Sequence, residues 1–270
     1  MVDTEQLLPK FRRPPLIEVV HGVQFGLLPM TIVHPGLFYE AIRDRYPIAL
    51  TRPPLAATRE ILDEGTPAPF SFSFLGPANL PRAWFASKDG THLVQLQNDR
   101  LLLNWRRGEQ SSVYPHFEQV SAEFQRLYQR LEAFVAENSL GVFQPNQCEV
   151  SYINHLSSHF EPVNPGEYIK IWNGRQGSFN EQVEDCALNL RFLIRNEDKK
   201  PVGRLIINMT TLPTPDRKRV LQLDMTARGA PVGGGLDGVV GFHKIAHEKI
   251  VRYFAEITTA EAQNKWERFV

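Results

Sequence analysis

The order of predicted elements in this 270-residue chain runs through the same series twice. Each half opens with an apolar strand, continues with segments rich in Val, Ile, Leu and Phe, and closes with an amphipathic helix. The opening strands are Leu16–Phe25 and Cys148–Leu156, and the closing helices are Pro115–Glu137 and Leu236–Ile257. Strands grouped ahead of a helix are typical of α+β proteins with antiparallel sheets. We therefore expect an α+β fold of two pseudo-repeated β-α-β-β-β-α halves, with antiparallel sheet packed against long helices.

This order predicts three segments. A mobile arm (1–15) precedes the first half (16–138), and a connector leads to the second half (147–270). We expect the halves to share one sheet in a single compact domain. Few residues are identical between the halves, so the predicted repeat rests on the order of elements.

The periodicity within each half predicts its smaller elements. In the first strand, Val19 and Val23 alternate to one face while Glu18 and Gln24 fall on the other. A helix starts at His34-Pro35 and continues to Tyr46, because proline suits the first turn. The other predicted strands are Phe70–Leu75, Trp84–Ala86 running into Leu93–Gln97, Arg100–Arg107, Cys186–Arg195, Val202–Leu212 and Arg219–Thr226. Shorter predicted elements are a strand near Ile61, a helix over Pro165–Trp172 and a terminal helix that begins with a capping box at Thr258.

The composition narrows the class of protein. The 30 basic and 30 acidic residues cancel, which removes the simplest argument for binding to nucleic acid or a membrane surface. The 2 cysteines are too few for a disulfide scaffold and have no metal-site spacing. The chain has no apolar stretch of the roughly 20 residues that span a bilayer, and no signal-peptide core. We expect a cytoplasmic protein without membrane contact or cofactor.

Several phrases of the sequence carry a resemblance to a known family. They are FRRPPLIEVVHGVQF, LLLNWRR followed by VYPHFEQV, EVSYINHL, and AHEKIVRYFAEITTAEAQNKWER. In this order they resemble a sporadically distributed prokaryotic family of uncharacterised proteins. Its members begin with a Pro-Pro-Ile/Leu-x-Glu segment, share Tyr-Pro and Tyr-x-Asn motifs, and end with a His-containing helix and a Trp. The resemblance spans nearly the whole chain and implies a bacterial cytoplasmic protein, with a defence or conflict system as one setting. It implies no activity or catalytic residue.

Polar side chains in the two opening strands are the first candidates for a site. Glu18 lies in an apolar strand, where an unpaired charge is costly. It contacts a ligand or acts as a general base, or else it lies on the solvent-exposed face of the strand or pairs with an arginine such as Arg12 or Arg13. Tyr152, Asn154 and His155 occupy the matching strand of the second half. They either build a polar site with Glu18 between the halves or bond to backbone groups, which is the more common use of such side chains.

The closing helix of the second half carries His243 and His247 on one face. This spacing suits a metal, but a zinc site needs at least a third ligand, and the sequence HKIAHE is not HExxH. Both residues also follow the apolar stripe of the helix, which favours core or interface histidines. The stretch GAPVGGGLDG ahead of this helix matches neither the dinucleotide nor the P-loop pattern.

Positive charge is concentrated in both blocks of strands. Residues 191–228 contain nine basic and four acidic residues, and residues 82–107 contain five and two. With Trp84, Phe85 and Trp105 nearby, such a sheet face suits single-stranded nucleic acid or another polyanion. Ordinary solvated hairpins with balanced charges are the alternative, since the pI of about 7.1 is low for a nucleic-acid binder.

No motif compels an enzyme assignment. We therefore expect a non-enzymatic binding or interaction protein that acts as a homo-oligomer or with a co-encoded protein partner. The alternatives are a nucleic-acid or nucleotide-binding protein with a basic sheet face, and an enzyme with a site between the halves. No catalytic residue, metal ligand or cofactor is predicted. The candidate binding residues are Glu18, Trp105, Tyr152, Asn154, His155, Arg217, Lys218, Arg219 and His247.

Overall fold

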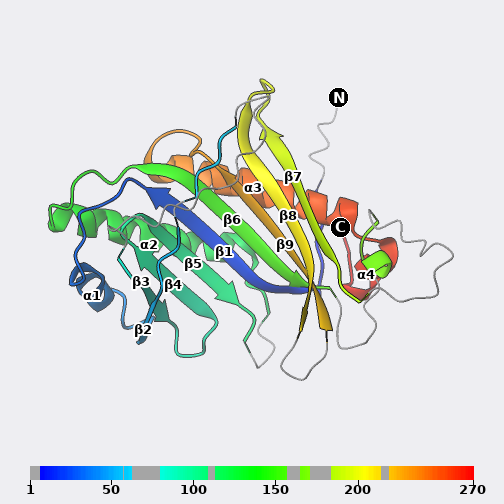
Figure 1. Ribbon diagram of the computed structural model, residues 1–270, viewed down its shortest axis with the longest axis horizontal. Helices are drawn as coiled ribbons and strands as arrows, with labels where there is room; N and C mark the ends of the chain where they lie inside the picture. Colours follow the sequence, from blue (N-terminus) through cyan, green and yellow to red (C-terminus); the bar gives the residue numbers. More distant parts are fainter. Residues whose placement is uncertain are drawn as a thin grey trace.

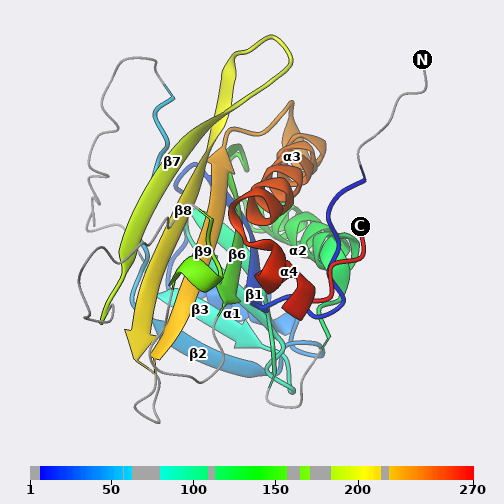
Figure 2. The ribbon, with the colours of Figure 1, turned by 90° about the vertical axis from the view of Figure 1, so that its right-hand side faces the viewer.

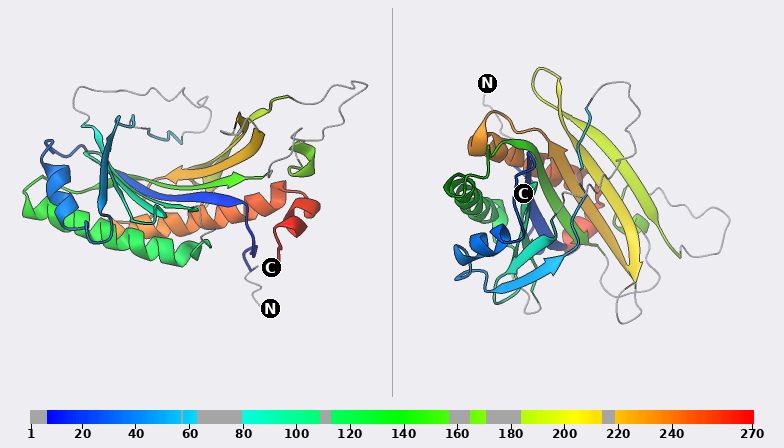
Figure 3. Two further views of the ribbon diagram at one scale, coloured as in Figure 1. Left: turned by 90° about the horizontal axis from the view of Figure 1, so that it is seen from below. Right: turned by 60° about the vertical axis from the view of Figure 1, so that its left-hand side comes forward.

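Helices cover one face of a single antiparallel sheet in this protein (Figures 1 and 2). The computed structural model describes residues 7–56, 58–62, 80–108, 113–156, 165–170, 184–213 and 219–270. In these residues the fold is α+β, with nine strands and four α-helices. Helices α2 (His116–Glu137) and α3 (Gly235–Ile257) lie side by side against the sheet, and α1 (His34–Glu40) and α4 (Ala260–Lys265) lie near its ends (Figure 3).

The sheet joins both halves of the chain. Its strand order is β2-β3-β4-β5-β1-β6-β9-β8-β7, so the two opening strands β1 and β6 are neighbours at its centre. They pair antiparallel, with Val20 opposite Ser151. The strands are β1 (Leu16–Phe25), β2 (Ile48–Arg52), β3 (Arg82–Ala86), β4 (His92–Gln97), β5 (Arg100–Arg106), β6 (Pro145–His155), β7 (Ala187–Arg195), β8 (Pro201–Pro213) and β9 (Arg219–Gly229).

The two faces of this sheet differ in chemistry, because successive side chains of a strand point to opposite faces. On β1, Val19, Val23 and Phe25 face the helices and are buried. Glu18 and Gln24 point to the other side, as the alternation predicted. We call the side toward α2 and α3 the helix face, and the opposite side the polar face.

The hydrophobic core fills the space between the helix face and helices α2 and α3. On α2, buried apolar residues recur every three or four positions, which directs one stripe of the helix at the sheet. The stripe of α3 packs on β6, β9 and β8. The buried residues of the two stripes include Val120, Phe124, Leu127, Leu131, Phe134, Val239, Phe242, Ala246 and Ile250.

Several short elements differ from the sequence prediction. Helix α1 ends at Glu40 and turns follow it, so it is shorter than expected. The strand expected near Ile61 is absent there, and β2 lies earlier, at Ile48–Arg52. Residues 82–97 form the hairpin β3–β4 and not one continued strand. The helix expected over Pro165–Trp172 is a 3₁₀ turn at Pro165–Glu167 in the described residues, and Phe70–Leu75 lies outside them.

The terminal helix starts one residue later than the capping pattern predicted. Thr259 caps α4, since its hydroxyl accepts a hydrogen bond from the Ala262 amide. The Thr258 hydroxyl instead donates to the Phe254 carbonyl of the preceding helix, at 2.7 Å. Thr258 therefore closes α3 and its neighbour opens α4.

The N-terminal segment contacts the C-terminus. The Arg12 and Arg13 amides donate to the carbonyls of Glu267 and Trp266. The Phe11 ring packs edge-on against Phe254 and Trp266. The expected mobile arm is thus held in place at residues 10–13.

No helix in the described ranges is both long and apolar enough to cross a lipid bilayer.

Two glycines let α3 approach the sheet closely. A Cβ built on Gly229 would lie 2.3 Å from the Val202 carbonyl oxygen and 2.4 Å from the Phe242 ring. A Cβ on Gly203 would lie 2.7 Å from the Arg228 carbonyl oxygen and 2.9 Å from the same ring. Phe242 is fully buried over this pair. Any larger residue must displace backbone or a packed ring.

We predict that Gly229→Ala lowers the free energy of unfolding by about 1–3 kcal/mol, because overpacking forces such shifts. Urea denaturation followed by circular dichroism measures the change. Gly36→Ala in α1 is the matched control, since a Cβ there meets nothing within 4 Å and alanine favours a helix over glycine. Equal stability of Gly229→Ala and the wild type would contradict the close-packing account.

Candidate functional site

A short segment of the chain crosses the polar face of the sheet. We call residues 53–56 and 58–62 the strap. Side chains of the sheet hold its backbone: Gln97 bonds both the amide and the carbonyl of Leu55. Further along, Gln147 accepts a hydrogen bond from the Glu60 amide at 2.8 Å. Arg204 donates to the Glu60 carboxylate at 2.8 Å and to the Ile61 carbonyl at 2.9 Å. The strap therefore explains why many buried side chains on this face are polar.

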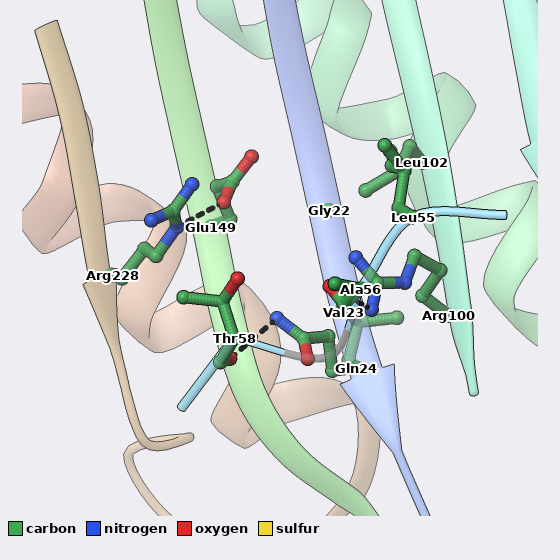
Figure 4. A pocket seen from close by; sticks show the side chains of 10 residues that line it. All are labelled: Gly22, Val23, Gln24, Leu55, Ala56, Thr58, Arg100, Leu102, Glu149 and Arg228. Carbon is green, nitrogen blue, oxygen red and sulfur yellow. Dashed lines mark hydrogen bonds and ion pairs between the residues drawn. The ribbon is translucent and has the colours of Figure 1, made fainter. Parts of the chain in front are cut away.

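A pocket of about 240 Å³ lies between the strap and the sheet (Figure 4). Gly22 and Leu102 form its floor, and Leu55 and Ala56 of the strap pass over it. The remaining lining residues are Val23, Gln24, Thr58, Arg100, Glu149 and Arg228.

Ionic and amide groups form the polar part of the pocket wall. Glu149 and Arg228 form an ion pair across β6 and β9, and Glu60 of the strap lies 3.8 Å from the same guanidinium. These carboxylates raise the pKa of Arg228 against the opposing effect of its burial. Gln24 donates to the Thr58 carbonyl at 3.1 Å. The pocket thus presents charged and apolar surface side by side.

Three arginines surround Trp84 on the polar face. The guanidinium carbons of Arg52, Arg82 and Arg106 lie 4.8, 5.3 and 5.3 Å from the centroid of the Trp84 ring. They come from β2, β3 and β5, so strand pairing brings them together. We call these four residues the Trp84 cluster.

A chain of hydrogen bonds fixes the Trp84 cluster to the centre of the sheet. The Trp84 indole and the Arg82 guanidinium both donate to the Gln95 side-chain oxygen, at 3.1 and 2.8 Å. Gln95 donates to Asn104, and Asn104 donates to Glu18 at 2.6 Å. Arg106 also donates to Glu18, at 2.9 Å. The partner of Glu18 is therefore Arg106, and not Arg12 or Arg13.

A second carboxylate lies across β6 from Glu18. Ile153 pairs with Glu18 on one side and with Asp224 on the other. Burial raises the pKa of Asp224, and the charge of Glu18 adds to this rise. One carboxylate oxygen of Asp224, Oδ1, is buried without a hydrogen-bond partner in the described residues. Gln222 donates to the other oxygen and contacts the His155 ring. Glu18, His155, Gln222 and Asp224 thus form a polar group on β1, β6 and β9, at the opposite end from Trp84 of a row of polar side chains.

The helix face holds a separate polar contact. The Tyr152 hydroxyl lies 2.7 Å from His247 Nδ1 and 3.1 Å from the Tyr114 hydroxyl. His247 also stacks on Phe117, with the ring centroids 4.2 Å apart. Three phrases from distant parts of the sequence, VYPHFEQV, EVSYINHL and AHEKIVRYF, thus meet between the helices and β6.

Two further histidines are fully buried beside this contact. His21 of β1 and His243 of α3 have ring centroids 5.0 Å apart. His243 Nε2 lies 3.0 Å from the Gly22 carbonyl oxygen, whereas neither ring nitrogen of His21 has a partner in the described residues. Burial lowers the pKa of His243 and His247 to about 4 and that of His21 well below its usual value. These rings are therefore neutral parts of the core at pH 7.

The structure separates several of the residues that the sequence singled out. Glu18 and His155 lie on the polar face, but Asn154 lies on the helix face, where its amide donates to the Leu223 carbonyl at 3.2 Å. Trp105 is 2% exposed and packs edge-on against Tyr114 in the core. Arg219 pairs with Glu184 at 3.0 Å. Arg217 and Lys218 lie outside the described residues.

Sequence reasoning missed Arg52, Arg82 and Asp224. Alternation along β3 and β9 could have placed Arg82 and Asp224 on the same side as their polar neighbours. It could not have given the strand order that puts Arg52 beside Trp84. Arg52 and Arg82 are 30 residues apart in sequence, and their pairing across β2 and β3 is set by the tertiary structure.

Comparison with known proteins gives no family or relative for this chain: no protein-family model matches it, and no curated protein is significantly similar. Within the described ranges, no three His, Cys, Asp or Glu side chains are grouped so that they could hold a metal ion. The residues of the polar face are therefore the basis for inferring a function.

We predict that the free energy of unfolding falls as the pH is lowered from about 6.5 toward 4. Unfolded histidines bind protons in this range, whereas the buried neutral rings do not, so protonation favours the unfolded chain. For His243 the full effect is on the order of 3 kcal/mol, at 1.36 kcal/mol per pKa unit. Urea denaturation at a series of pH values measures it.

His243→Gln keeps a donor for the Gly22 carbonyl but removes the titrating ring. Its unfolding free energy should depend less on pH than that of the wild type. His116→Gln is the matched control, because His116 is exposed at the start of α2. The account fails if His243→Gln and His116→Gln show the same pH dependence.

Proposed function

We propose that this chain is a non-enzymatic binding protein and that the polar face of its sheet holds the ligand. The observation that carries the proposal is a row of polar side chains from Trp84 to His155 that includes buried atoms with no hydrogen-bond partner in the described residues. These atoms are Arg82 Nε and Asp224 Oδ1. A buried polar atom without a partner is costly, and bound ligands or waters commonly satisfy it.

The strap does not explain this row. Gln24, Gln97, Gln147 and Arg204 bond to the strap and have a structural use. No hydrogen bond joins the Trp84 cluster to the described residues of the strap. The same holds for the group of Glu18, His155, Gln222 and Asp224. Polar side chains that hold no element of the fold in place are the better candidates for contact with a ligand.

The charges of the polar face support an anionic ligand near Trp84. In the described residues Arg106 pairs with Glu18, but neither Arg52 nor Arg82 has a carboxylate partner. At the other end of the row Asp224 adds a carboxyl group whose burial favours its neutral form. A ligand that carries negative charge at one end therefore fits the row best.

An enzyme with a site between the halves has weaker support. That hypothesis requires Glu18, Asn154 and His155 to act together. The Asn154 side chain lies on the helix face and is engaged with a backbone carbonyl, so it does not reach the polar face. A catalytic site would need another partner for Glu18 and His155.

We also propose that the two halves of the chain are an internal duplication. What supports it is the strand order: β5, β4 and β3 follow outward from β1, and β9, β8 and β7 follow outward from β6. The helix after each group, α2 or α3, packs on the helix face. The row of polar side chains from Trp84 to His155 crosses the boundary between the two halves.

We also propose that the protein is cytoplasmic and that it self-associates or acts with a co-encoded partner. We further propose that it belongs to the bacterial family of the sequence resemblance. The support for self-association is that β2 and β7 are edge strands of the described sheet, and every residue of β2 is exposed. Edge strands offer backbone groups to a further strand.

Native mass spectrometry of the full chain, purified gently in a single step, tests the proposed function. We expect a non-covalent adduct that is released under denaturing conditions. The double variant Glu18→Gln with Arg106→Gln neutralises the ion pair of this row at nearly constant size. It should reduce the adduct at least several-fold, because charge pairs contribute to binding when a ligand desolvates them.

A second ion pair provides the matched control. Arg130 and Glu137 form a pair at 3.5 Å on α2, away from the polar face. Arg130→Gln with Glu137→Gln removes the same charges and should leave the adduct unchanged. Equal occupancy in both double variants would contradict a ligand on the polar face.

A further inference from the structure

The Trp84 cluster concentrates positive charge around one aromatic ring. Arg82 lies beside Arg52, Arg100 and Arg106, whose charges add to the effect of burial and lower its pKa. Arg100 is engaged by Asp99, and Arg106 by Glu18. Arg52 and Arg82 are left without a carboxylate partner among the described residues. Like charges held together repel one another, so an anion bound here would stabilise the cluster.

Arg82 has a donor ready for such an anion. Its Nη1 donates to Gln95, but its Nε–H is buried without an acceptor in the described part of the chain. Guanidinium groups recognise phosphate through paired N–H donors. Arg52 is exposed on the neighbouring edge strand, and within the described ranges its Nη1 donates only to the Thr51 carbonyl. Two guanidinium groups can therefore turn toward one phosphate.

The indole of Trp84 supplies a flat surface that the exposed Arg52 guanidinium covers at 4.8 Å, so a base can stack there once Arg52 turns to the phosphate. Its ring is fixed by the hydrogen bond from Nε1 to Gln95 and by strand β3. Residues that are held by strands and by a second layer of hydrogen bonds keep their geometry without a ligand. Aromatic side chains next to basic groups are the usual platform on which nucleobases stack.

We propose that the Trp84 cluster binds a nucleotide, with the phosphate on Arg82 and Arg52 and the base on Trp84. This inference rests on the proposed function, and it names the ligand class and the end of the polar row that the phosphate occupies. The source of the nucleotide is either a free molecule or one residue of a single strand, and the two share this chemistry.

The test is fluorescence anisotropy of the full chain with a labelled oligothymidylate of about twelve residues, within the span of known single-strand sites. At about 50 mM salt we expect binding that weakens steeply toward 200 mM, because phosphate contacts release counterions. Competition with thymidine monophosphate and with inorganic phosphate separates the sources. Displacement by the free nucleotide at similar concentration indicates a mononucleotide ligand, and displacement by the strand alone indicates single-stranded nucleic acid.

Variants of the cluster locate the site. Trp84→Ala should weaken binding about 5- to 100-fold, the range for loss of one base stack, whereas Trp84→Phe keeps a platform and stays near wild type. Arg82→Gln should weaken binding and reduce the slope of log Kd against log salt by about 0.7. Arg130→Gln on α2 is the matched control and should change nothing. Thermal denaturation of each variant separates lost binding from lost folding.

Two results would overturn the proposal. One is no binding of the strand or the mononucleotide at low salt by folded wild-type protein. The other is binding that neither Trp84→Ala nor Arg82→Gln weakens, even where a change of Arg219 abolishes it. If the native adduct in such a case still disappears on neutralising Glu18 and Arg106, the nucleotide assignment fails while the binding function stands.

Discussion

The antiparallel pairing of β1 with β6 is the constraint on which the rest of the structure depends. It joins the two halves of the chain into one sheet and fixes which side chains of each half are neighbours. Because this pair sits at the centre, its alternation sets the two faces. Val19 and Val150 point into the core, and Glu18 and Ser151 point to the polar face. A shift of one residue in this register would exchange the faces of one half relative to the other.

The polar face is then used in two ways. Near the Asn98-Asp99 turn its side chains hold the strap by bonds to backbone groups, which gives partners to the amides of Leu55 and Glu60 where this irregular segment crosses the sheet. Elsewhere the polar residues bond mainly to one another, as in the series from Trp84 to Glu18. The helix face differs, because α2 and α3 pack on its central strands β5, β1, β6, β9 and β8.

The sequence predicted the large elements well. The strand Leu16–Phe25 and helix α2 are where periodicity placed them, because each has a long apolar alternation or stripe. It failed where the stabilising partner is distant. β2 is exposed along its length although Ile48 and Leu50 alternate in it, and its pairing with β3 is what makes it a strand. Ile61 looked like part of a strand, yet its carbonyl is bonded by Arg204, which lies 143 residues away in sequence.

By itself, the sequence determined that this is an α+β protein and which residues of each strand share a face, because side-chain periodicity is a local property of the backbone. Only the tertiary structure decided which candidates meet. Strand order and register placed Glu18 with Arg106, and buried Trp105 while leaving Trp84 among three arginines. These outcomes depend on pairings between residues far apart in the chain, which no local pattern encodes.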